Sequence, residues 1–422
     1  MIELIEMGRK AREAALSLMN TSTEEKNRGI QAAASSLRQQ AAEIVRENAR
    51  DLQNAKEKNM PESLQDRLLL NEDRIEAMAQ AMEKIVLLPD PVGELVEKID
   101  RPNGLRIEKR RVPIGVIGII YEARPNVTSD AFSLCLKSGN AVILKGGSDA
   151  VFSNLAITRA LRAGLSAAGM NPDILQLIED TSHETTREFM QLNGYVDVLI
   201  PRGSQRLIQA VLKNATVPVI ETGAGNCHIF LDQTADVEKA VPIVVNAKTQ
   251  RTGVCNACES LVVDRRALKT VLLPVAEALI AKKVTIYADP ESFAALSEAP
   301  ALDKAHLKAA EEADFGTEYL DLKISVKTVG SVEEAIRHIN RWSTKHSESI
   351  VTEDREHAER FMNGIDSACV YWNASTRFTD GGEFGFGAEI GISTAKLHAR
   401  GPMGLRELTT TKYTIYGNGQ VR

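Results

Sequence analysis

The sequence has few cysteines and no long hydrophobic runs. Five cysteines in 422 residues do not make a disulfide framework, so we expect a reducing compartment. The longest apolar runs, such as residues 112–121, are too short to cross a bilayer. Glu3 and Glu6 stand where a secretory signal would be basic and then apolar. These features predict a cytoplasmic protein without a membrane partner.

The sequence also has no excess of basic residues. The formal net charge is −6 and no basic tract occurs, which argues against nucleic acid as a main partner. No Gly-x-Gly-x-x-Gly dinucleotide fingerprint follows an early strand, and no internal repeat is evident. What remains, with 43% hydrophobic and 26% charged residues, is typical of a globular enzyme of two or three domains.

Helix-forming residues dominate the first 88 positions. Thr23 can cap one helix, because Glu24, Glu25 and a long Ala/Leu/Gln-rich run follow it. Asn71 can cap another helix, whose apolar stripe is typical of core contacts. A chain reversal at 101–104 is expected before a strand-like segment at 105–111.

Apolar strands then alternate with amphipathic helices, which predicts parallel sheets covered by helices on both faces. The first series of expected strands comprises 115–120, 141–144, 174–178, 196–200 and 217–220, with helices at 129–137, 150–168 and 184–192. The second series comprises strands at 260–263, 284–287, 322–328, 349–352 and 368–371, with helices at 266–281, 302–312, 331–341 and 354–363. We therefore expect two α/β domains joined near 222–236. Ligands of such sheets bind beyond the carboxyl ends of the strands.

Two features interrupt this alternation. Pro242 must either kink a helix that starts at Asp236 or mark the true start of that helix. Near the chain end, a Gly/aromatic loop at 381–387 precedes a β-prone segment at 407–416. A long terminal strand is an aggregation-prone edge unless it is paired, so we expect it to pair with another subunit.

Cys255 lies on a tight connection between a helix and an expected strand at 259–264. Gly253 tolerates positive φ and would let the backbone turn sharply there. A thiol attacks as its thiolate, and Lys248 and Arg251 supply positive charge nearby in sequence. The stretch is typical of a rigidly held nucleophile.

Other interpretations of Cys255 remain open at this point. Free cysteines are often inert core residues. Cys255 and Cys258 also have a redox or metal spacing, to which Cys227 and His228 could add ligands. A structural zinc site usually needs two such spaced pairs, however, and only one occurs, so we predict no metal site.

Polar residues follow several of the expected strands. Lys145 precedes a glycine turn, and Gly203-Ser204 opens a helix whose bare amides would favour a phosphate. Ordinary turn chemistry explains the same residues. Asn126 offers amide donors for an oxyanion, although taken alone it is better explained as a helix cap. Glu221 could be a base or a solvated carboxylate at a strand end.

Taken together, the ordered set Asn126, Lys145, Gly203-Ser204, Glu221 and Cys255 resembles the aldehyde dehydrogenase superfamily. Within it, the chain resembles a branch that reduces an acyl phosphate, and the resemblance covers nearly the whole chain. The stretches that carry it are Tyr-Glu-Ala-Arg-Pro-Asn at 121–126, Asn-Ala-Lys-Thr-Gln-Arg at 246–251, Val-Cys-Asn-Ala at 254–257 and His-Ala-Arg-Gly-Pro-Met-Gly at 398–404.

The resemblance implies an aldehyde dehydrogenase-like α/β fold with two parallel-sheet α/β domains plus a small β oligomerisation flap. Residues 1–100 and 113–228 would form an NADP-binding domain. Residues 229–395 would form a catalytic domain with the nucleophilic cysteine. Residues 101–112 and 396–422 would form the oligomerisation flap, and the protein would be a homo-oligomer.

Carried over by position, the resemblance also implies roles for single residues. Cys255 would be the nucleophile and Asn126 the oxyanion-hole amide. The cofactor NADPH would be held by Lys145 near the adenosine ribose, by Gly203-Ser204 at the helix start that faces the pyrophosphate, and by Glu318 at the nicotinamide ribose. Glu221, whose counterpart activates water in hydrolytic relatives, is grouped with the cofactor residues. Gly253-Val254 replaces the usual Gly-Gln before the nucleophile.

The implied reaction is the NADPH-dependent reduction of L-glutamyl 5-phosphate to L-glutamate 5-semialdehyde through a cysteine thioester, in proline biosynthesis. Arg124 and Arg251 are the candidates to meet the departing phosphate, and functional coupling to glutamate 5-kinase is expected. The alternatives are an NAD(P)-dependent aldehyde dehydrogenase that forms a free acid, a metal- or redox-binding protein, and a catalytically silent binding subunit.

Overall fold

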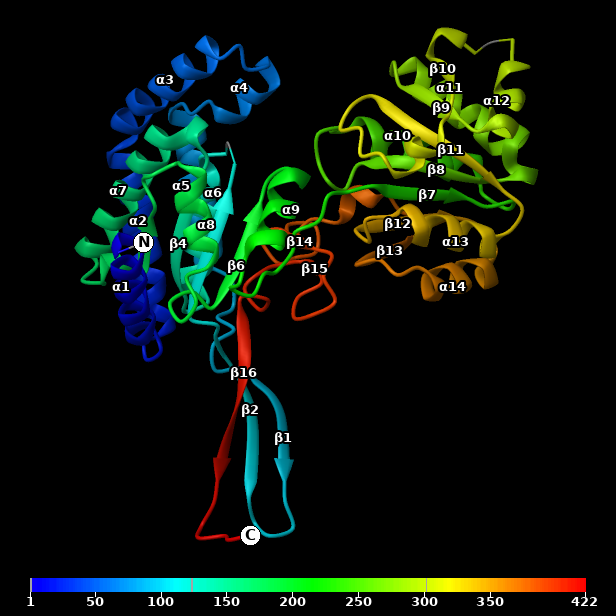
Figure 1. Ribbon diagram of the computed structural model, residues 1–422. Coiled ribbons are helices and arrows are strands. Elements are labelled where there is room, and N and C mark those ends of the chain that lie inside the picture. The colour runs from blue at the N-terminus through cyan, green and yellow to red at the C-terminus, as the bar shows by residue number, and fades with distance from the viewer. Residues whose placement is uncertain (1, 123, 301) are drawn as a thin grey trace. The chain divides into compact units, whose positions relative to one another are not determined.

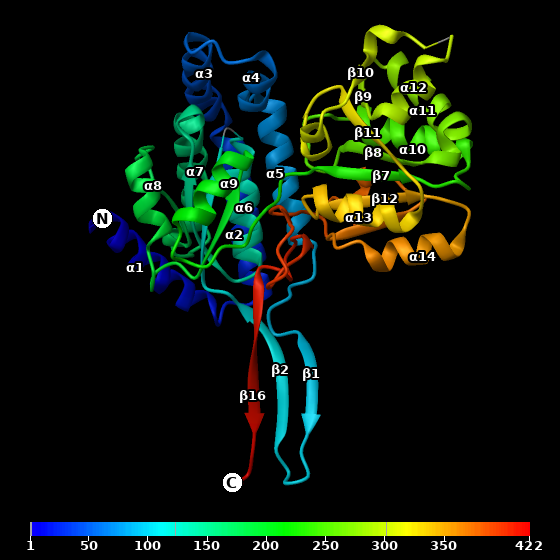
Figure 2. The same ribbon diagram turned by 45° about the vertical axis from the view of Figure 1, so that its right-hand side comes forward.

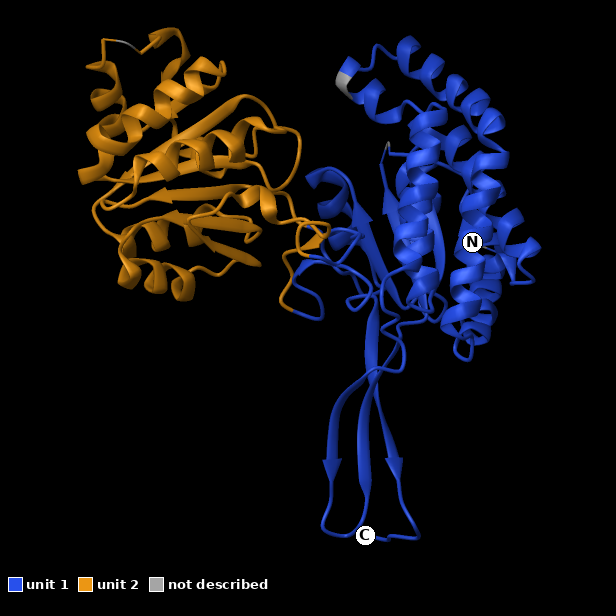
Figure 3. Cartoon of the chain, turned by 180° about the vertical axis from the view of Figure 1, so that it is seen from behind, with its two compact units in different colours: residues 1–222, 385–391, 397–422 blue, residues 223–384, 392–396 orange. Residues whose placement is uncertain are grey.

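The computed structural model describes residues 2–122, 124–300 and 302–422 (Figure 1). The chain forms two compact units, which Figure 3 distinguishes by colour. Unit 1 comprises residues 1–222, 385–391 and 397–422, and unit 2 comprises 223–384 and 392–396. The chain thus passes into unit 2 twice, over 223–384 and briefly over 392–396, and ends in unit 1. Ala123, within the stretch 121–126, lies outside the described residues.

Unit 1 begins with helices α1 (Ile2–Leu18), α2 (Thr23–Gln39), α3 (Ala41–Glu57), α4 (Glu62–Leu68) and α5 (Glu72–Val86). The expected cap at Thr23 is wrong by one residue. Ser22 caps α2 in a capping box, in which its hydroxyl accepts from the Glu25 amide and the Glu25 carboxylate accepts from the Ser22 amide. The cap at Asn71 is confirmed, since its side chain accepts from the Arg74 amide at 2.8 Å.

The sheet of unit 1 is parallel, with strand order β5-β4-β3-β6. Its strands are β3 (Val116–Tyr121), β4 (Ala141–Gly146), β5 (Leu175–Leu177) and β6 (Val198–Arg202), and they are almost entirely buried. They lie among helices that include α6 (Asn126–Lys137), α7 (Val151–Ala167), α8 (His183–Met190) and α9 (Gln205–Asn214) (Figure 2).

One expected strand of this unit is wrong. Residues 217–220 make only a single bridge, between Val219 and Leu199. The Pro218 carbonyl accepts from the Leu199 amide at 2.8 Å. Proline has no backbone N–H to donate, so it interrupts a ladder that would otherwise continue.

Unit 2 contains a seven-stranded parallel sheet of order β10-β9-β11-β8-β7-β12-β13. Its strands are β7 (Cys227–Leu231), β8 (Cys258–Asp264), β9 (Thr285–Ala288), β10 (Leu307–Ala309), β11 (Lys323–Val329), β12 (Ser347–Val351) and β13 (Cys369–Trp372). Its α-helices are α10 (Val237–Thr249), α11 (Leu273–Ala281), α12 (Pro290–Ser297), α13 (Val332–Trp342) and α14 (Arg355–Gly364). Two parallel-sheet α/β units confirm the predicted fold class.

Several local predictions for unit 2 need correction. Strand β7 was not predicted, although all its residues are buried. The expected helix at 302–312 is wrong: a 3-10 turn at Lys304–His306 is followed by β10, which pairs with β9. Helix α10 begins at Val237 with Asp236 as its cap, and Pro242 lies inside it rather than at its start.

A third, antiparallel sheet belongs to unit 1 and has the order β1-β2-β16 (Figure 1). It comprises β1 (Leu95–Asp100), β2 (Arg106–Pro113) and β16 (Thr409–Tyr416), so it starts earlier in the chain than the expected range 101–112. Strand β16 pairs with β2 of its own chain and forms an edge of this sheet, so pairing of its other side with another subunit stays a prediction. None of the helices in the described part of the chain combines the length and apolarity that a bilayer crossing requires.

Candidate active site

Cys255 lies in a loop, residues 250–257, that connects α10 to β8 and is called here the Cys255 loop. Cys255 is half-buried, whereas Asn256 and Ala257 behind it are buried. The strand that follows is in the centre of the sheet, next to β7 and β11. The thiol is therefore carried on a short, well-anchored connection at the amino end of β8.

The glycine on which this loop depends is Gly225, which the sequence did not single out. A β-carbon on Gly225 would lie 1.4 Å from the Cys255 carbonyl oxygen. Gly253, expected to turn the chain, is not among the glycines with positive φ in the described part of the chain. The loop is thus shaped by close contact with another backbone segment, not by a left-handed glycine of its own.

Glu318 holds the segment that supports the loop. Its carboxylate oxygen Oε1 accepts a hydrogen bond from the Gly225 amide at 2.7 Å. The Cys227 thiol, two residues further on, donates to the Cys255 carbonyl at 3.2 Å. Glu318, predicted to bind cofactor, is therefore brought by the structure to the backbone that contacts Cys255.

The other cysteines nearby are buried. Burial raises the pKa of Cys227 and of Cys258 well above the usual value of a thiol. His228 is engaged elsewhere, since its Nδ1 lies 3.1 Å from a Glu348 carboxylate oxygen. Among residues 2–122, 124–300 and 302–422, no three His, Cys, Asp or Glu side chains are grouped as metal ligands.

Of the two cations predicted to lie near the thiol, Lys248 already forms an ion pair with another residue. Lys248 is fully buried, and its ammonium lies 2.6 Å from the Glu259 carboxylate. Burial raises the pKa of Glu259 to about 7, against the opposing effect of the Lys248 charge. Arg251 is exposed.

A third cation, Arg377, was missed. Its Nε donates to Gln250 Oε1 at 2.9 Å, and its Nη1 donates to Asn256 Oδ1. Burial lowers the pKa of this guanidinium, while the neighbouring Asp380 and Cys255 raise it. The signal in the sequence was the run Ser375-Thr376-Arg377, a capped turn shortly after β13.

The predicted cofactor residues of unit 1 lie along one edge of its sheet. Tyr121, at the carboxyl end of β3, pairs with Gly146 of β4 on one side and with Arg202 of β6 on the other. Lys145 is therefore close to this edge, and Gly203-Ser204 follows it. Lys145 is only 3% exposed, and its ammonium donates to the Gly146 carbonyl at 3.3 Å. Burial lowers the Lys145 pKa, with Asp180 opposing.

Ser204 caps α9, as a phosphate-facing helix start would require. Both its donors are used by Glu122, a residue to which the sequence gave no role. The Ser204 amide lies 2.7 Å from Glu122 Oε2, and the Ser204 hydroxyl lies 2.8 Å from Glu122 Oε1. A carboxylate thus occupies the position that was predicted for a phosphate.

Asn126 is the first residue of α6, and Pro125 precedes it as the boundary residue. The exposed Asn126 side chain donates from Nδ2 to Asp130 Oδ2 at 2.9 Å. Burial raises the pKa of Asp130 to about 6, while Asn126 and Arg202 oppose the shift. Because an amide has two N–H bonds, this contact orients Asn126 and leaves its second donor for another acceptor.

The remaining predicted residues divide between the units. Arg124 and Glu221 are half-buried and belong to unit 1. The same unit contains Asn126, Lys145, Gly203 and Ser204. Cys255, Arg251 and Glu318 belong to unit 2. The structure therefore gathers the expected cofactor-phosphate residues in one unit and the thiol with Glu318 in the other.

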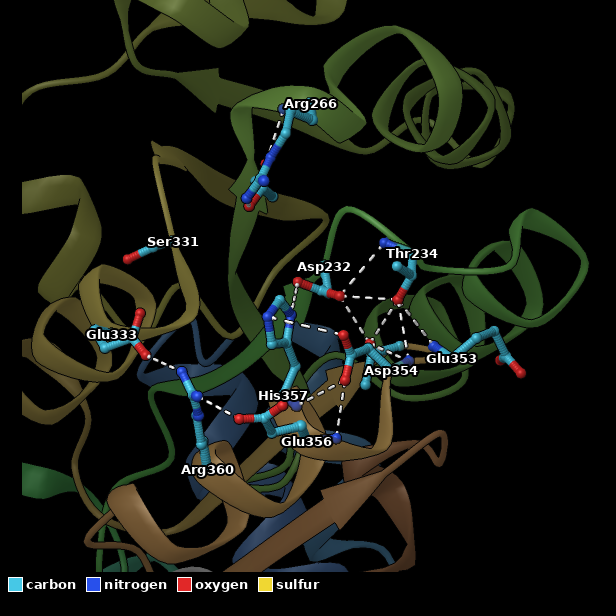
Figure 4. A network of polar contacts seen from close by, with 12 residues as sticks. Asp232, Thr234, Arg266, Ser331, Glu333, Glu353, Asp354, Glu356, His357 and Arg360 are labelled. Atoms are coloured by element: carbon cyan, nitrogen blue, oxygen red, sulfur yellow. Dashed lines mark hydrogen bonds and ion pairs between the residues drawn. The ribbon is translucent and has the colours of Figure 1, made fainter.

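A separate polar network lies at the opposite, carboxyl end of the unit 2 sheet (Figure 4). Asp232 follows β7 and is fully buried. Its carboxylate accepts from Thr352 at 2.7 Å and from Thr234 at 2.9 Å, and lies 3.0 Å from His357 Nδ1. This network holds the ends of β7 and β12 to α14.

Comparison with known proteins gives one family over the length of the chain. The aldehyde dehydrogenase family matches residues 3–318 and 324–414. A gamma-glutamyl phosphate reductase of Clostridium perfringens is 54% identical over 420 residues, which cover 100% of this chain and 99% of that protein. A gamma-glutamyl phosphate reductase of Caldicellulosiruptor bescii is 53% identical over 422 residues, which cover 100% of both.

Solved structures agree. The crystal structure of gamma-glutamyl phosphate reductase from Thermotoga maritima is similar to this chain with a TM-score of 0.96 and 49% identity, covering 100% of both chains. With identities near one half over the full length, the chain belongs to the aldehyde dehydrogenase family and, within it, to the gamma-glutamyl phosphate reductases.

Proposed function

We propose that this chain catalyses the NADPH-dependent reduction of L-glutamyl 5-phosphate to L-glutamate 5-semialdehyde and phosphate, a step of proline biosynthesis. The observation that carries the proposal is the half-buried Cys255 on a loop fixed by Gly225, in a chain about half identical to gamma-glutamyl phosphate reductases. The family name gives the phosphorylated substrate, and the thiol gives a route to reduce it.

Cys255 is the nucleophile in this proposal. Its thiolate attacks the acyl carbon, a carbon–sulfur bond forms, and the bond from that carbon to the phosphate oxygen breaks. The phosphate leaves with the bonding electrons, which gives a thioester on Cys255. Arg124 and Arg251 are the candidates to receive the departing anion. Covalent catalysis divides one difficult substitution into easier steps.

Asn126 stabilises the oxyanion that forms during each addition to the acyl carbon. Its second amide hydrogen is suited to this role because Asp130 already holds the first, at 2.9 Å. A backbone amide near Cys255 supplies a further donor. One such donor contributes roughly 3–4 kcal/mol of transition-state stabilisation in comparable sites.

The residues of unit 1 fit an anionic dinucleotide. Lys145 offers a cation at the carboxyl end of β4, and Gly203-Ser204 offers a helix start. A phosphate placed there would take over the Ser204 donors from Glu122. Glu318 is proposed to hold the nicotinamide ribose, and Glu221 is grouped with these cofactor residues. Bound NADPH supplies the hydride that reduces the thioester, after which the carbon–sulfur bond breaks and Cys255 is regenerated.

The test is reduction of NADP⁺ by glutamate 5-semialdehyde, with and without phosphate, which runs the reaction backwards and avoids the unstable acyl phosphate. We expect phosphate-dependent turnover, and phosphate-independent formation of free acid would support an ordinary aldehyde dehydrogenase instead. Cys255→Ser should abolish turnover and leave NADPH binding intact, while Cys369→Ser, at another half-buried cysteine of unit 2, serves as control. Full activity of Cys255→Ser would refute the thioester.

We also propose that the protein acts as a homo-oligomer and is functionally coupled to glutamate 5-kinase. The antiparallel sheet β1-β2-β16 carries exposed apolar side chains: Leu95, Val96, Tyr413, Ile415 and Tyr416. An apolar surface of this kind is typical of an interface between chains. Light scattering of the purified protein, with a monomeric mass as the contrary result, tests the association.

A further inference from the structure

Arg377 is hydrogen-bonded to two separate residues of the Cys255 loop. Its guanidinium donates from Nε to Gln250, the first loop residue, and from Nη1 to Asn256, which directly follows Cys255. A planar guanidinium can satisfy both acceptors at once because its N–H bonds form a fixed fork. The side chain therefore spans the loop from one end to the residue next to the thiol.

The turn that carries Arg377 is itself fastened to the loop. The Thr376 hydroxyl donates to the Asn256 carbonyl at 2.7 Å, and the Asn256 side chain donates to the Thr379 carbonyl at 2.9 Å. The Thr379 hydroxyl lies 2.6 Å from the Ser347 hydroxyl and 2.7 Å from that of Tyr371. Arg377 is thus held by a buried hydrogen-bond network, and its position relative to Cys255 is fixed.

None of the other charged or titratable groups around the Cys255 loop, in the described part of the chain, places a positive charge on the loop as Arg377 does. Lys248 is closed in its buried pair with Glu259. The rest come from the elements that pack against the loop: Arg251 in the loop, Cys227 from β7, His346 before β12, Glu318 before β11, and Asp380 after the Arg377 turn. Of the cations, only Arg377 is both partly buried and hydrogen-bonded to the loop at two points in the described part of the chain.

We propose that Arg377 is a positioning residue for Cys255: it fixes the loop by binding Gln250 and Asn256, and its charge favours the thiolate. The proposal rests on the proposed function only in taking Cys255 as the nucleophile. A thiolate is the reactive form of cysteine, and a fixed neighbouring cation increases its population at neutral pH. Arg377 thus serves both geometry and electrostatics without contacting substrate.

The test compares Arg377→Gln, Arg377→Lys and the parent. The rate at which iodoacetamide alkylates Cys255 is followed from pH 5 to 10 by peptide mapping with fragmentation of each peptide, which distinguishes Cys255 from Cys258 on the same tryptic peptide and from the other three cysteines. Steady-state kcat and KM are measured on the same preparations, with Tm as a check of folding. Arg360→Gln is the matched control, because Arg360 is an exposed arginine of α14 in unit 2 that pairs with Glu333 of α13 and Glu356 of α14.

We expect Arg377→Gln to lower the alkylation rate at pH 7 about tenfold, as a rise of one pKa unit in the thiol would do. The midpoint of its pH profile should move upward, and kcat should fall while KM for NADPH stays within about twofold. Arg377→Lys keeps the charge but not the fork, so its alkylation profile should resemble the parent's while its kcat falls about tenfold.

The inference is overturned if folded Arg377→Gln has the parent's alkylation profile, or if the Lys and Gln variants react equally slowly. If Arg377→Gln does not fold, the kcat of Arg377→Lys decides, and an unchanged kcat overturns the positioning role. The alkylation measurement needs no substrate. It therefore separates failure of this inference from failure of the proposed function, which would appear as full activity in Cys255→Ser.

Discussion

The α-carbon of Gly225 lies so close to Cys255 that a β-carbon on it would stand 1.4 Å from the Cys255 carbonyl oxygen. The obstacle is backbone, which cannot rotate away as a side chain can. Gly225→Ala should therefore push the Cys255 loop out of place. We expect a loss of about 1–3 kcal/mol or more in the free energy of unfolding. Displacement of a nucleophile by about 1 Å should also lower kcat about a hundredfold.

Gly330→Ala is the matched control for that substitution. Gly330 is a glycine of unit 2 whose β-carbon would meet only the ends of flexible side chains, Arg265 Nη1 and Glu334 Oε2, both at 3.2 Å. Urea unfolding and kcat measure both variants. Parent-like stability and activity in Gly225→Ala would contradict the close contact described here.

Asp130 should make stability depend on pH in a defined direction. Burial raises its pKa from 3.8 to about 6, so the folded protein holds more protons than the unfolded chain between these values. The contribution of Asp130 to the free energy of unfolding is therefore present below about pH 4 and is lost as pH rises through about 6. Asp130→Asn cannot ionise and should gain stability relative to the parent across this window, by about 1 kcal/mol after screening by solvent.

The measurement is Tm of parent and Asp130→Asn at half-unit steps from pH 4 to 7. Glu72→Gln, at an exposed carboxylate of the same unit, corrects for general charge effects. A constant difference between parent and Asp130→Asn over the whole range would show that Asp130 does not titrate there.

Local patterns in the sequence were enough to predict the two parallel sheets and the position of Cys255 before β8. Both depend on short-range signals: apolar strands, helical stripes and turn residues. The stretch 302–312 shows where such signals fail. Its Ala- and Lys-rich composition favours a helix, but Leu307–Ala309 pairs with β9, because a neighbouring strand edge outweighs local propensity.

The support of the Cys255 loop could not be predicted in the same way. Gly225 and Arg377 are distant from Cys255 in sequence and contact the loop only through the tertiary fold, and Glu318 acts on the loop through its hydrogen bond to Gly225. Glu318 was found through the family resemblance, not through its surroundings. Gly225 had no local signal, and the run Ser375-Thr376-Arg377 indicates a capped turn without indicating that the turn contacts the Cys255 loop.

Lys145 and Glu122 should change cofactor affinity in opposite directions. Lys145→Ala removes the buried cation at the end of β4, and we expect NADPH to bind at least about tenfold more weakly, as for loss of a hydrogen bond to a charged group. Glu122→Gln removes a negative charge that now holds both Ser204 donors, and we expect NADPH to bind about threefold more tightly.

Titration of the variants with NADPH, followed by its fluorescence, measures both effects. Lys213→Ala is the control, because Lys213 is an exposed lysine in the last turn of α9, away from the end that Ser204 caps. Unchanged affinity in Lys145→Ala would mean that the ribose site has been assigned wrongly. Weaker binding in Glu122→Gln would mean that Glu122 supports the cofactor instead of competing with it.

The Asp232 network should matter for stability and not for catalysis. Its carboxylate is fully buried and serves Thr234, Thr352 and His357, so Asp232→Ala would leave three buried or half-buried polar groups without their acceptor (Figure 4). We expect a loss of about 3 kcal/mol in the free energy of unfolding. Activity at a temperature where the variant is folded should stay close to that of the parent, since Asp232 follows the carboxyl end of β7 whereas Cys255 precedes the amino end of β8.

His357→Gln tests the same network more mildly. It removes one contact to Asp232 and keeps those from Thr234 and Thr352, so we expect a loss of about 1 kcal/mol. Urea denaturation followed by circular dichroism gives both values, with kcat as the second measurement. A kcat that falls in Asp232→Ala but not in an equally destabilised variant elsewhere in unit 2 would contradict the separation of the two ends, because the network would then have to reach the thiol through the sheet itself.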